Sequence, residues 1–314
     1  MKSGELRDCL ERYLAVRRAV GFTMRAEEPR LRGFVAFVER HGADGALRAQ
    51  LAVDWARDDG KHTPGGQTQR LSMVRRFLVY LRASVPDTEV PPFGLIAGGG
   101  RPSPYIYTEA EVQRLLDAAR KLGPKGTLRP HTIATAIGLL ASCGLRAGEV
   151  IRLRLDDVQL DIEPARLQVL DSKFHKSRLV PLHPSVAQAL RAYASQRRRL
   201  GYGGYCEHFF VSESRGACRY QYFWYAFAGL VRRLGIGGEP RWPRLHDLRH
   251  TFAVRRVLAW YREGVDVQMR LPELSVYLGH IRPADTYWYL TAIPELLGSA
   301  AERFESFVNA RGAS

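Results

Sequence analysis

The sequence is poor in cysteine and has no cysteine pair at metal-binding or redox spacing. Its four cysteines are Cys9, Cys143, Cys206 and Cys218, and no two of them are separated by only two residues. A zinc ribbon needs closely spaced pairs, and a small secreted domain needs a dense disulfide framework. Neither is indicated, so we expect a protein of a reducing compartment that holds no metal.

Long apolar runs are also missing. The first residues, MKSGELRDCLERYLAVRR, intersperse charged and apolar positions and lack the apolar stretch of a signal peptide. No window stays apolar for the roughly 20 residues that a membrane-spanning helix requires. These absences predict a soluble cytoplasmic protein with no membrane partner.

Acidic residues are outnumbered by basic ones. The chain has 32 Asp and Glu against 47 Lys and Arg, which gives a formal net charge of +15 and a pI near 10.0. An excess of this size is typical of proteins that bind a polyanion, most often nucleic acid. A basic soluble protein without such a partner is the alternative that charge alone leaves open.

Hydrophobic residues make up 46% of the 314-residue chain, which is enough for the cores of about two domains. Apolar residues recur at helical spacing in four N-terminal segments, with breaks at Gly21 and at Thr63-Pro64-Gly65. We therefore predict a small all-helical domain over residues 1–84. The four expected helices cover about residues 6–14, 27–39, 46–55 and 67–82.

Proline and glycine dominate the next stretch, SVPDTEVPPFGLIAGGGRPSP. This composition cannot continue a helix and predicts an interdomain linker over residues 85–107. A second domain, residues 108–314, would begin at Thr108, with Glu111 completing a capping box. Its patterns predict a buried helix, a β-hairpin and a further helix, so the fold class is mainly α with a small β-sheet. These elements cover residues 131–142, 167–170 with 178–182, and 184–200.

The last N-terminal helix carries Arg70, Arg75 and Arg76 beside its apolar residues. Charged residues on a helix usually form only its solvated face. Several on one helix of so basic a chain favour contact with DNA phosphates instead. We add Lys176 and Arg178, next to the polar hairpin turn, to these candidate DNA contacts.

The segment YQYFWYAF, residues 220–227, has two interpretations. Aromatic side chains stack on bases in some nucleic-acid-binding proteins. More often they form a buried core, which is the interpretation we favour. The nearby GYGGYCEH lacks the Lys-Ser/Thr of a phosphate loop and is interpreted as a turn.

Cationic residues of the second domain are spaced so that a phosphate can be held. His246 and Arg249 are three residues apart on an expected helix, so both side chains emerge on one face. Arg146 directly follows the expected buried helix, and Glu149 is placed to hold its guanidinium from behind. A rigidly held arginine suits a group that meets developing negative charge.

Three further residues complete a set suited to phosphodiester chemistry. Lys173 lies in the hairpin turn, His280 follows a Leu-Gly pair, and Tyr289 comes nine residues later. A phenolic oxygen can attack a phosphorus atom while fixed cations hold the charge. We expect the rest of the chain to bring DNA to this set.

The motifs GLRAGE, KSRLVPL, HDLRHTFA and LGH, in this order and followed by a tyrosine, strongly resemble those of the tyrosine recombinases, also called the phage integrase family. Each motif alone is weak, but their order and spacing across residues 108–300 are specific. The segment QRLSMVRRFLVYL is similar to the part of that family's core-binding domain that packs on DNA. The resemblance implies a helical, SAM-like core-binding domain followed by an α+β catalytic domain.

The resemblance also implies roles for individual residues. Tyr289 would be the nucleophile that forms a 3′-phosphotyrosyl bond. Arg146 and Arg249 would neutralise the non-bridging phosphate oxygens, because a guanidinium presents a planar fork to phosphate. Lys173 would be the general acid that protonates the departing 5′-oxygen.

His246 would assist proton transfer and His280 would hydrogen-bond the phosphate. The implied partners are double-stranded DNA and further copies of the chain, as a tetramer on DNA, or related recombinases. No cofactor is implied, and the location would be nucleoid-associated. The tail after Tyr289, with Leu296, Phe304 and neighbours on one helical face, resembles transposon-borne members and would dock on its own domain or on a neighbouring protomer.

Some assignments depend on spacing alone. Tyr287 lies two residues before Tyr289, and the gap of nine residues from His280 decides for the latter. Lys176 lies near Lys173, which is preferred for its place before the VPL motif. His250 is left outside the catalytic set.

Other functions remain possible from the sequence. A catalytically silent DNA-binding protein of the same fold would keep the basic charge, and a type IB topoisomerase would share the chemistry. A metal-dependent hydrolase is suggested by His246 and His250 at i and i+4. The glutamate of an H-E-x-x-H motif is missing there, which makes the hydrolase the weakest alternative.

Overall fold

The protein is described by a computed structural model whose chain divides into two compact units, Met1–Pro102 and Ser103–Ser314. No helix in the described part of the chain has the length and apolar character needed to cross a membrane. The described residues are 3–41, 47–58, 60, 62–98, 103–172, 176–239, 242–280, 282 and 285–287.

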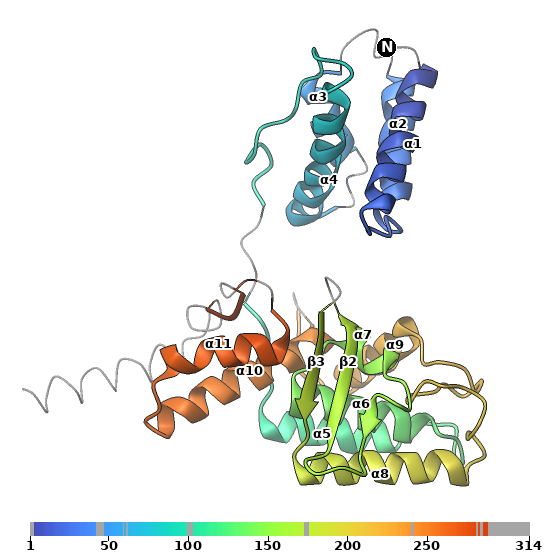
Figure 1. The fold of residues 1–314 in the computed structure, drawn as a ribbon, viewed down its shortest axis with the longest axis vertical. Coiled ribbons are helices and arrows are strands. Elements are labelled where there is room, and N and C mark those ends of the chain that lie inside the picture. Colours follow the sequence, from blue (N-terminus) through green and yellow to red (C-terminus); the bar gives the residue numbers. More distant parts are fainter. Residues whose placement is uncertain are drawn as a thin grey trace, which may run out of the picture. The chain divides into compact units, whose positions relative to one another are not determined.

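Unit 1 is a bundle of helices, as predicted. Each helix presents an apolar stripe to one core, in which Leu14, Leu31, Phe34, Phe77 and Leu78 are essentially inaccessible to solvent. Burial of such side chains is the main force that holds short helices together in water. Within the described residues the helices are α1 (Ser3–Ala19), α2 (Glu27–Arg40), α3 (Ala49–Arg57) and α4 (Pro64–Arg82) (Figure 1).

The proline-rich segment after α4 packs on unit 1. Ile96 is buried in the unit's core, and the side chain of Arg75 on α4 binds the same segment. Its Nε donates to the Pro91 carbonyl at 2.7 Å and its Nη2 to the Pro92 carbonyl at 2.8 Å. The boundary between the two units falls within the predicted linker of residues 85–107, but Ile96 and the Pro91 and Pro92 carbonyls belong to unit 1.

Unit 2 combines helices with a small antiparallel sheet, which confirms the predicted fold class. The sheet order is β1-β2-β3. Figure 1 shows α10 and α11 as a pair beside the sheet. The described elements are α5 (Glu109–Arg120), α6 (Arg129–Cys143), α7 (Ala147–Arg152), β1 (Val158–Gln159), β2 (Arg166–Ser172), β3 (Lys176–Pro181), α8 (Pro184–Arg199), α9 (Tyr220–Arg233), α10 (Leu245–Arg262) and α11 (Val267–Leu278).

The register of the hairpin decides which side chains face the helices. Leu167 of β2 lies opposite Val180 of β3, and Val169 lies opposite Arg178. Directly opposed residues point to the same face of a sheet, and alternate residues of one strand do the same. Since Leu167, Val169 and Val180 are buried, Arg178 also projects into the interior of unit 2.

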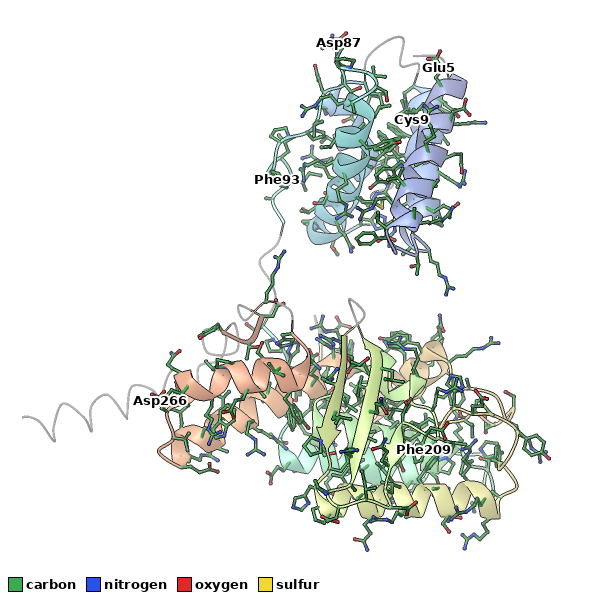
Figure 2. All side chains as sticks on the ribbon, viewed as in Figure 1. Glu5, Cys9, Asp87, Phe93, Phe209 and Asp266 are labelled. Carbon is green, nitrogen blue, oxygen red and sulfur yellow. The ribbon has the colours of Figure 1, made fainter. Side chains whose placement is uncertain are left out.

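The aromatic segment on α9 divides between core and surface. Phe223 and Phe227 are buried in the main core of unit 2, which also contains Phe209 (Figure 2). Trp224 and Tyr225, on the opposite side of the helix, are exposed and stack edge to face with ring centroids 4.9 Å apart. The core interpretation is confirmed for the two phenylalanines and wrong for Trp224 and Tyr225.

Helix α6 ends at a glycine that no other residue can replace without strain. Gly144 adopts φ +60°, and a Cβ atom built there would lie 2.4 Å from Cδ1 of Phe252 on α10. The left-handed backbone and the close approach of α10 both require glycine. This contact sets how α6 and α10 pack.

We predict that Gly144→Ala destabilises unit 2 by about 2–4 kcal/mol, because about 1–2 kcal/mol of left-handed strain adds to a clash that the packed core cannot absorb. Gly126→Ala is the matched control, since Gly126 also has positive φ (+77°) but nothing lies within 4 Å of a Cβ atom built there. Gly126→Ala should lower the unfolding free energy only by the strain of a left-handed backbone. Urea unfolding of both variants checks this, and equal losses would contradict the packing argument.

Candidate active site

Arg249 of α10 lies almost completely buried, at 1% exposure, and is held by the ends of two other helices. Its Nη1 donates to the Gly144 carbonyl at 2.8 Å and its Nη2 to the Leu278 carbonyl at 2.7 Å. Gly144 caps α6, and Leu278 is the last residue of α11. The last carbonyls of a helix lack intrahelical partners and carry its partial negative charge, so they suit a guanidinium.

Arg146 is fixed on two sides at the start of α7. Its backbone N–H donates to Oε2 of Glu149 at 2.9 Å and its Nη1 to Oε1 of the same carboxylate at 2.8 Å. Its Nη2 donates to the Gly279 carbonyl at 2.9 Å. The expected support of Arg146 by Glu149 is confirmed, and the side chain remains 24% exposed at the surface of the site.

Glu149 is a buried carboxylate between two arginines. Nη1 and Nη2 of Arg178 donate to its two oxygens at 3.1 and 2.9 Å. Burial alone would raise the pKa of Glu149, but the hydrogen bonds and charge of Arg178, with those of Arg146, lower it to about 2. The group is therefore ionised at pH 7.

The side chain of Arg178 is directed into the protein and not toward its surface, which corrects our placement of it among exposed DNA contacts. Its side chain is only 10% exposed and is occupied by Glu149 and by the Tyr277 carbonyl, which accepts from Nε at 2.7 Å. The hairpin register turns it inward, as described above. It is a structural partner of the site that sequence reasoning placed in the wrong environment.

His246 and His250 lie on successive turns of α10 with ring centroids 4.6 Å apart. His246 reaches the surface, whereas His250 is buried. Lost hydration and then the positive charges of Arg249 and Arg146 lower the pKa of His246 well below its ordinary value. The imidazole is therefore neutral near pH 7. No group of three or more His, Cys, Asp and Glu side chains in the described residues is arranged to hold a metal ion.

His280 follows α11 and is oriented by a residue that sequence reasoning missed. Its Nδ1 lies 2.7 Å from Oγ1 of Thr286, which is fully buried, and its backbone N–H donates to the Ser275 carbonyl at 2.9 Å. A hydrogen bond at one ring nitrogen fixes the plane and the direction of the other. The only signal for Thr286 in the sequence is its place between His280 and Tyr289.

The structure thus brings together Arg146, His246, Arg249 and His280 around the end of α11. Three consecutive carbonyls there, of Tyr277, Leu278 and Gly279, accept from Arg178, Arg249 and Arg146 respectively. The remaining predicted members, Lys173 and Tyr289, lie outside the described residues, as do the side chain of Lys176 and the tail that includes Leu296 and Phe304.

The three candidate DNA contacts of unit 1 lie in different environments. Arg70 lies over the Trp55 ring, with its Cζ 4.0 Å from the centroid, and donates to the Trp55 carbonyl at 2.7 Å. Arg75 is buried against the proline segment and stacks on Phe93, so its assignment as a DNA contact is corrected. Arg76 is exposed on α4, where it can meet an external partner.

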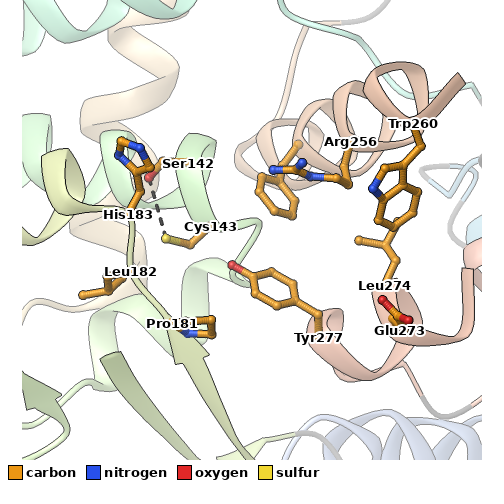
Figure 3. Close-up of a pocket in the computed structure, with 11 residues that line it drawn as sticks. Ser142, Cys143, Pro181, Leu182, His183, Arg256, Trp260, Glu273, Leu274 and Tyr277 are labelled. Atoms are coloured by element: carbon orange, nitrogen blue, oxygen red, sulfur yellow. Dashed lines mark hydrogen bonds between the residues drawn. The ribbon is translucent and has the colours of Figure 1, made fainter. Parts of the chain in front are cut away.

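A pocket of about 480 Å³ lies behind this site, between α6, β3, α10 and α11 (Figure 3). Figure 3 shows the phenol of Tyr277 directed toward Cys143, across from Arg256 and Trp260 of α10. None of the four described members of the predicted set lines the pocket. It is mainly apolar, so it is not the place where a phosphate would bind.

Comparison with known proteins decides the family. Residues 106–295, more than half of the chain, match the phage integrase family. The chain belongs to this family, the tyrosine recombinases. It is 38% identical over 306 residues to the provisionally named integrase/recombinase y4rB of Sinorhizobium fredii, covering 95% of this chain and 96% of that protein.

Solved structures of tyrosine recombinases share the fold. The chain is similar to XerH site-specific recombinase bound to palindromic difH substrate, with a TM-score of 0.68 and 16% identity over 97% of this chain and 85% of that one. It is equally similar to the Tn1549 transposon integrase in complex with transposon right end DNA, with a TM-score of 0.68 and 16% identity over 96% and 99% of the two chains.

We predict that Glu149→Gln lowers the unfolding free energy at pH 7 by about 3 kcal/mol, because a pKa lowered from 4.5 to about 2 corresponds to about 1.4 kcal/mol per unit. A lowered folded-state pKa stabilises above pH 4.5, and this stabilisation disappears as the pH falls toward 2. The difference from the wild type should therefore shrink below pH 4.5.

Urea unfolding at pH 7, 5 and 3.5 measures this difference. Asp117→Asn, which breaks the exposed pair between Asp117 and Arg120 on α5, is the control and should change stability little at any of these values. A loss in Glu149→Gln that stayed constant down to pH 3.5 would show that the ionised carboxylate is not the source of the stability.

Proposed function

We propose that this tyrosine recombinase cleaves and rejoins DNA strands at specific sites through a 3′-phosphotyrosyl intermediate. The observation that carries the proposal is the convergence of Arg146, Arg249, His246 and His280 at the end of α11. Cations fixed before the reaction stabilise developing charge without having to rearrange. A protein that only bound DNA would have no need to fix Arg146, Arg249 and His280 through so many hydrogen bonds.

In the proposed reaction the phenolic oxygen of Tyr289 attacks the scissile phosphorus. A bond forms between phosphorus and this oxygen, and the bond to the 5′-oxygen breaks. Arg146 and Arg249 hold the non-bridging oxygens, and Lys173 gives a proton to the departing 5′-oxygen. The reverse attack by a free 5′-hydroxyl rejoins a strand, so no nucleotide cofactor is needed.

The histidines have different tasks in this proposal. His246 would accept the phenolic proton, for which its ring must be neutral; the lowered pKa favours the neutral form and also makes the ring a weaker base. His280 would hydrogen-bond a non-bridging oxygen, with Thr286 setting the direction of its ring. Both residues would act on the same phosphate as the arginines.

Double-stranded DNA is the proposed partner, with four copies of the chain assembled on it. The net charge of +15 supports a polyanionic partner. Similarity to y4rB over nearly the whole of both chains supports a role in integration or transposition of a mobile element. The tail after Tyr289 would link neighbouring copies.

Unit 1 would hold the DNA backbone through cations at the surface of α1 and α4. Arg17, Arg75, Arg76 and Arg82 border one hollow of unit 1, and of these Arg75 is bound to the Pro91 and Pro92 carbonyls. Arginines grouped in this way can contact successive phosphates, which gives affinity without sequence readout. Of the α4 residues first considered, Arg76 is the one we retain as a phosphate contact.

We predict that Tyr289→Phe abolishes the covalent complex with DNA, because only the phenolic oxygen can form the bond to phosphorus. The wild type, incubated with nicked duplexes taken from the DNA that flanks its gene, should yield a protein–DNA adduct stable in denaturing gels. Tyr287→Phe is the matched control and should keep the adduct. Loss in Tyr287→Phe instead would move the nucleophile to Tyr287, and salt-sensitive binding without any adduct would favour the silent DNA-binding alternative.

We predict that Arg76→Gln weakens binding to specific and random duplexes alike and lowers the slope of log affinity against log salt concentration by about 1. Arg75→Gln should instead lower the stability of unit 1 by about 1–3 kcal/mol, because the Pro91 and Pro92 carbonyls lose their donors. Fluorescence anisotropy at several salt concentrations, paired with thermal unfolding, separates the two. If both variants lost binding and neither lost stability, our placement of Arg75 would be wrong.

A further inference from the structure

Arg178 has no assigned part in the proposed chemistry, yet its guanidinium contacts two separate parts of the site's framework. It reaches three acceptors: both oxygens of Glu149 and the Tyr277 carbonyl. Its side chain is 10% exposed, so these contacts lie within the protein. A buried arginine that binds a carboxylate in this bidentate way is geometrically specific, and a lysine could not reproduce the arrangement.

The contacts of Arg178 form a closed ring with those of Arg146. Arg178 holds Glu149, and Glu149 holds both the backbone and the guanidinium of Arg146. Arg146 in turn donates to the Gly279 carbonyl, two residues beyond the Tyr277 carbonyl that Arg178 binds. The ring joins β3, the start of α7 and the end of α11.

Gly279 allows this ring to close. It adopts φ +67°, and a Cβ atom built there would lie 2.9 Å from Nη1 of Arg178. Any side chain at this position would collide with the guanidinium in its observed position. The contacts of Arg178 with Glu149 and with the Tyr277 carbonyl therefore require glycine at position 279.

We propose that Arg178 is a positioning residue that fixes the guanidinium of Arg146 by tying Glu149 to the last turn of α11. The inference rests on the proposed function for the role of Arg146 but not for the ring of contacts itself. Arg249 and His280 also bind carbonyls of α11. The packing of this helix and the position of Arg146 are therefore coupled. Without Arg178, Glu149 would be a buried carboxylate with one cationic partner fewer.

The test compares Arg178→Gln, Arg178→Lys and the surface control Arg120→Gln in the full-length protein. Without DNA, hydrogen exchange of the backbone amides should accelerate in Arg178→Gln both at residues 146–150 and at residues 278–280, and Arg120→Gln should match the wild type. Arg178→Lys keeps a cation opposite Glu149 and is expected to fold. If Arg178→Gln does not fold, hydrogen exchange is measured in Arg178→Lys instead. It should show an intermediate acceleration, because a single ammonium cannot make all three contacts.

The second readout is the rate of covalent-complex formation against pH. In Arg178→Gln the rate should fall at least tenfold at pH 7, with DNA affinity within about twofold of the wild type. A further decline should appear toward acidic pH, because Glu149 has lost the partner that keeps it ionised, and adding Glu149→Gln should remove this pH dependence. A folding defect alone would not make the rate fall toward acidic pH in a way that Glu149→Gln removes.

The outcomes separate this inference from the proposed function. Accelerated exchange at both segments, in a protein whose wild type forms no adduct, supports the positioning role and overturns the proposed function. Wild-type exchange in both Arg178 variants, or a covalent-complex rate within twofold of Arg120→Gln with an unchanged pH profile, overturns the positioning role.

Discussion

Backbone carbonyls at the ends of α6 and α11 hold the arginines, and the site depends on this interaction. Arg249 bridges the two helix ends, and Arg146 and Arg178 bind the carbonyls on either side of its α11 acceptor. The end of a helix offers several acceptors with a partial negative charge that moves only if the helix moves. Cations held in this way are rigid without a dense shell of carboxylates, which would cancel the positive charge that a phosphate needs.

Glu149 supplies the buried carboxylate of this framework, and two arginines share it. A single buried ion pair often gives little net stability, because desolvation offsets attraction. Here the carboxylate accepts from two guanidinium groups and one backbone N–H, so its desolvation is compensated and a net positive charge remains. Lost hydration, and after it the charges of Arg249 and Arg146, lower the pKa of His246, so a neutral ring lies beside these cations.

Local patterns in the sequence predicted most of the framework and failed where a partner came from a distant backbone. The i, i+3 spacing predicted the pair of Arg146 with Glu149, and two short apolar runs around a polar turn predicted the hairpin. Arg178 alternates with the buried Val180 on the inward face of β3, a signal that was present in the sequence and was not used. Arg75 lies on the buried side of α4 beside Leu71 and Leu78, and its acceptors are carbonyls 16 and 17 residues away. Helices α4 and α6 begin earlier than expected because Pro64 and Pro130 are accommodated in their first turns.

The choice of arginine follows from the geometry of a helix end. A guanidinium has five N–H donors in one plane, so a donor on one edge can bind a carbonyl while the opposite edge stays directed toward another acceptor. An ammonium has three donors that rotate about one bond, and a carbonyl that binds it does not fix the direction of the others. Arg146, with Nη2 on the Gly279 carbonyl and Nη1 on Glu149, is oriented about every bond of its side chain. A phosphate that approaches this site therefore meets a cation whose direction the end of α11 has already set.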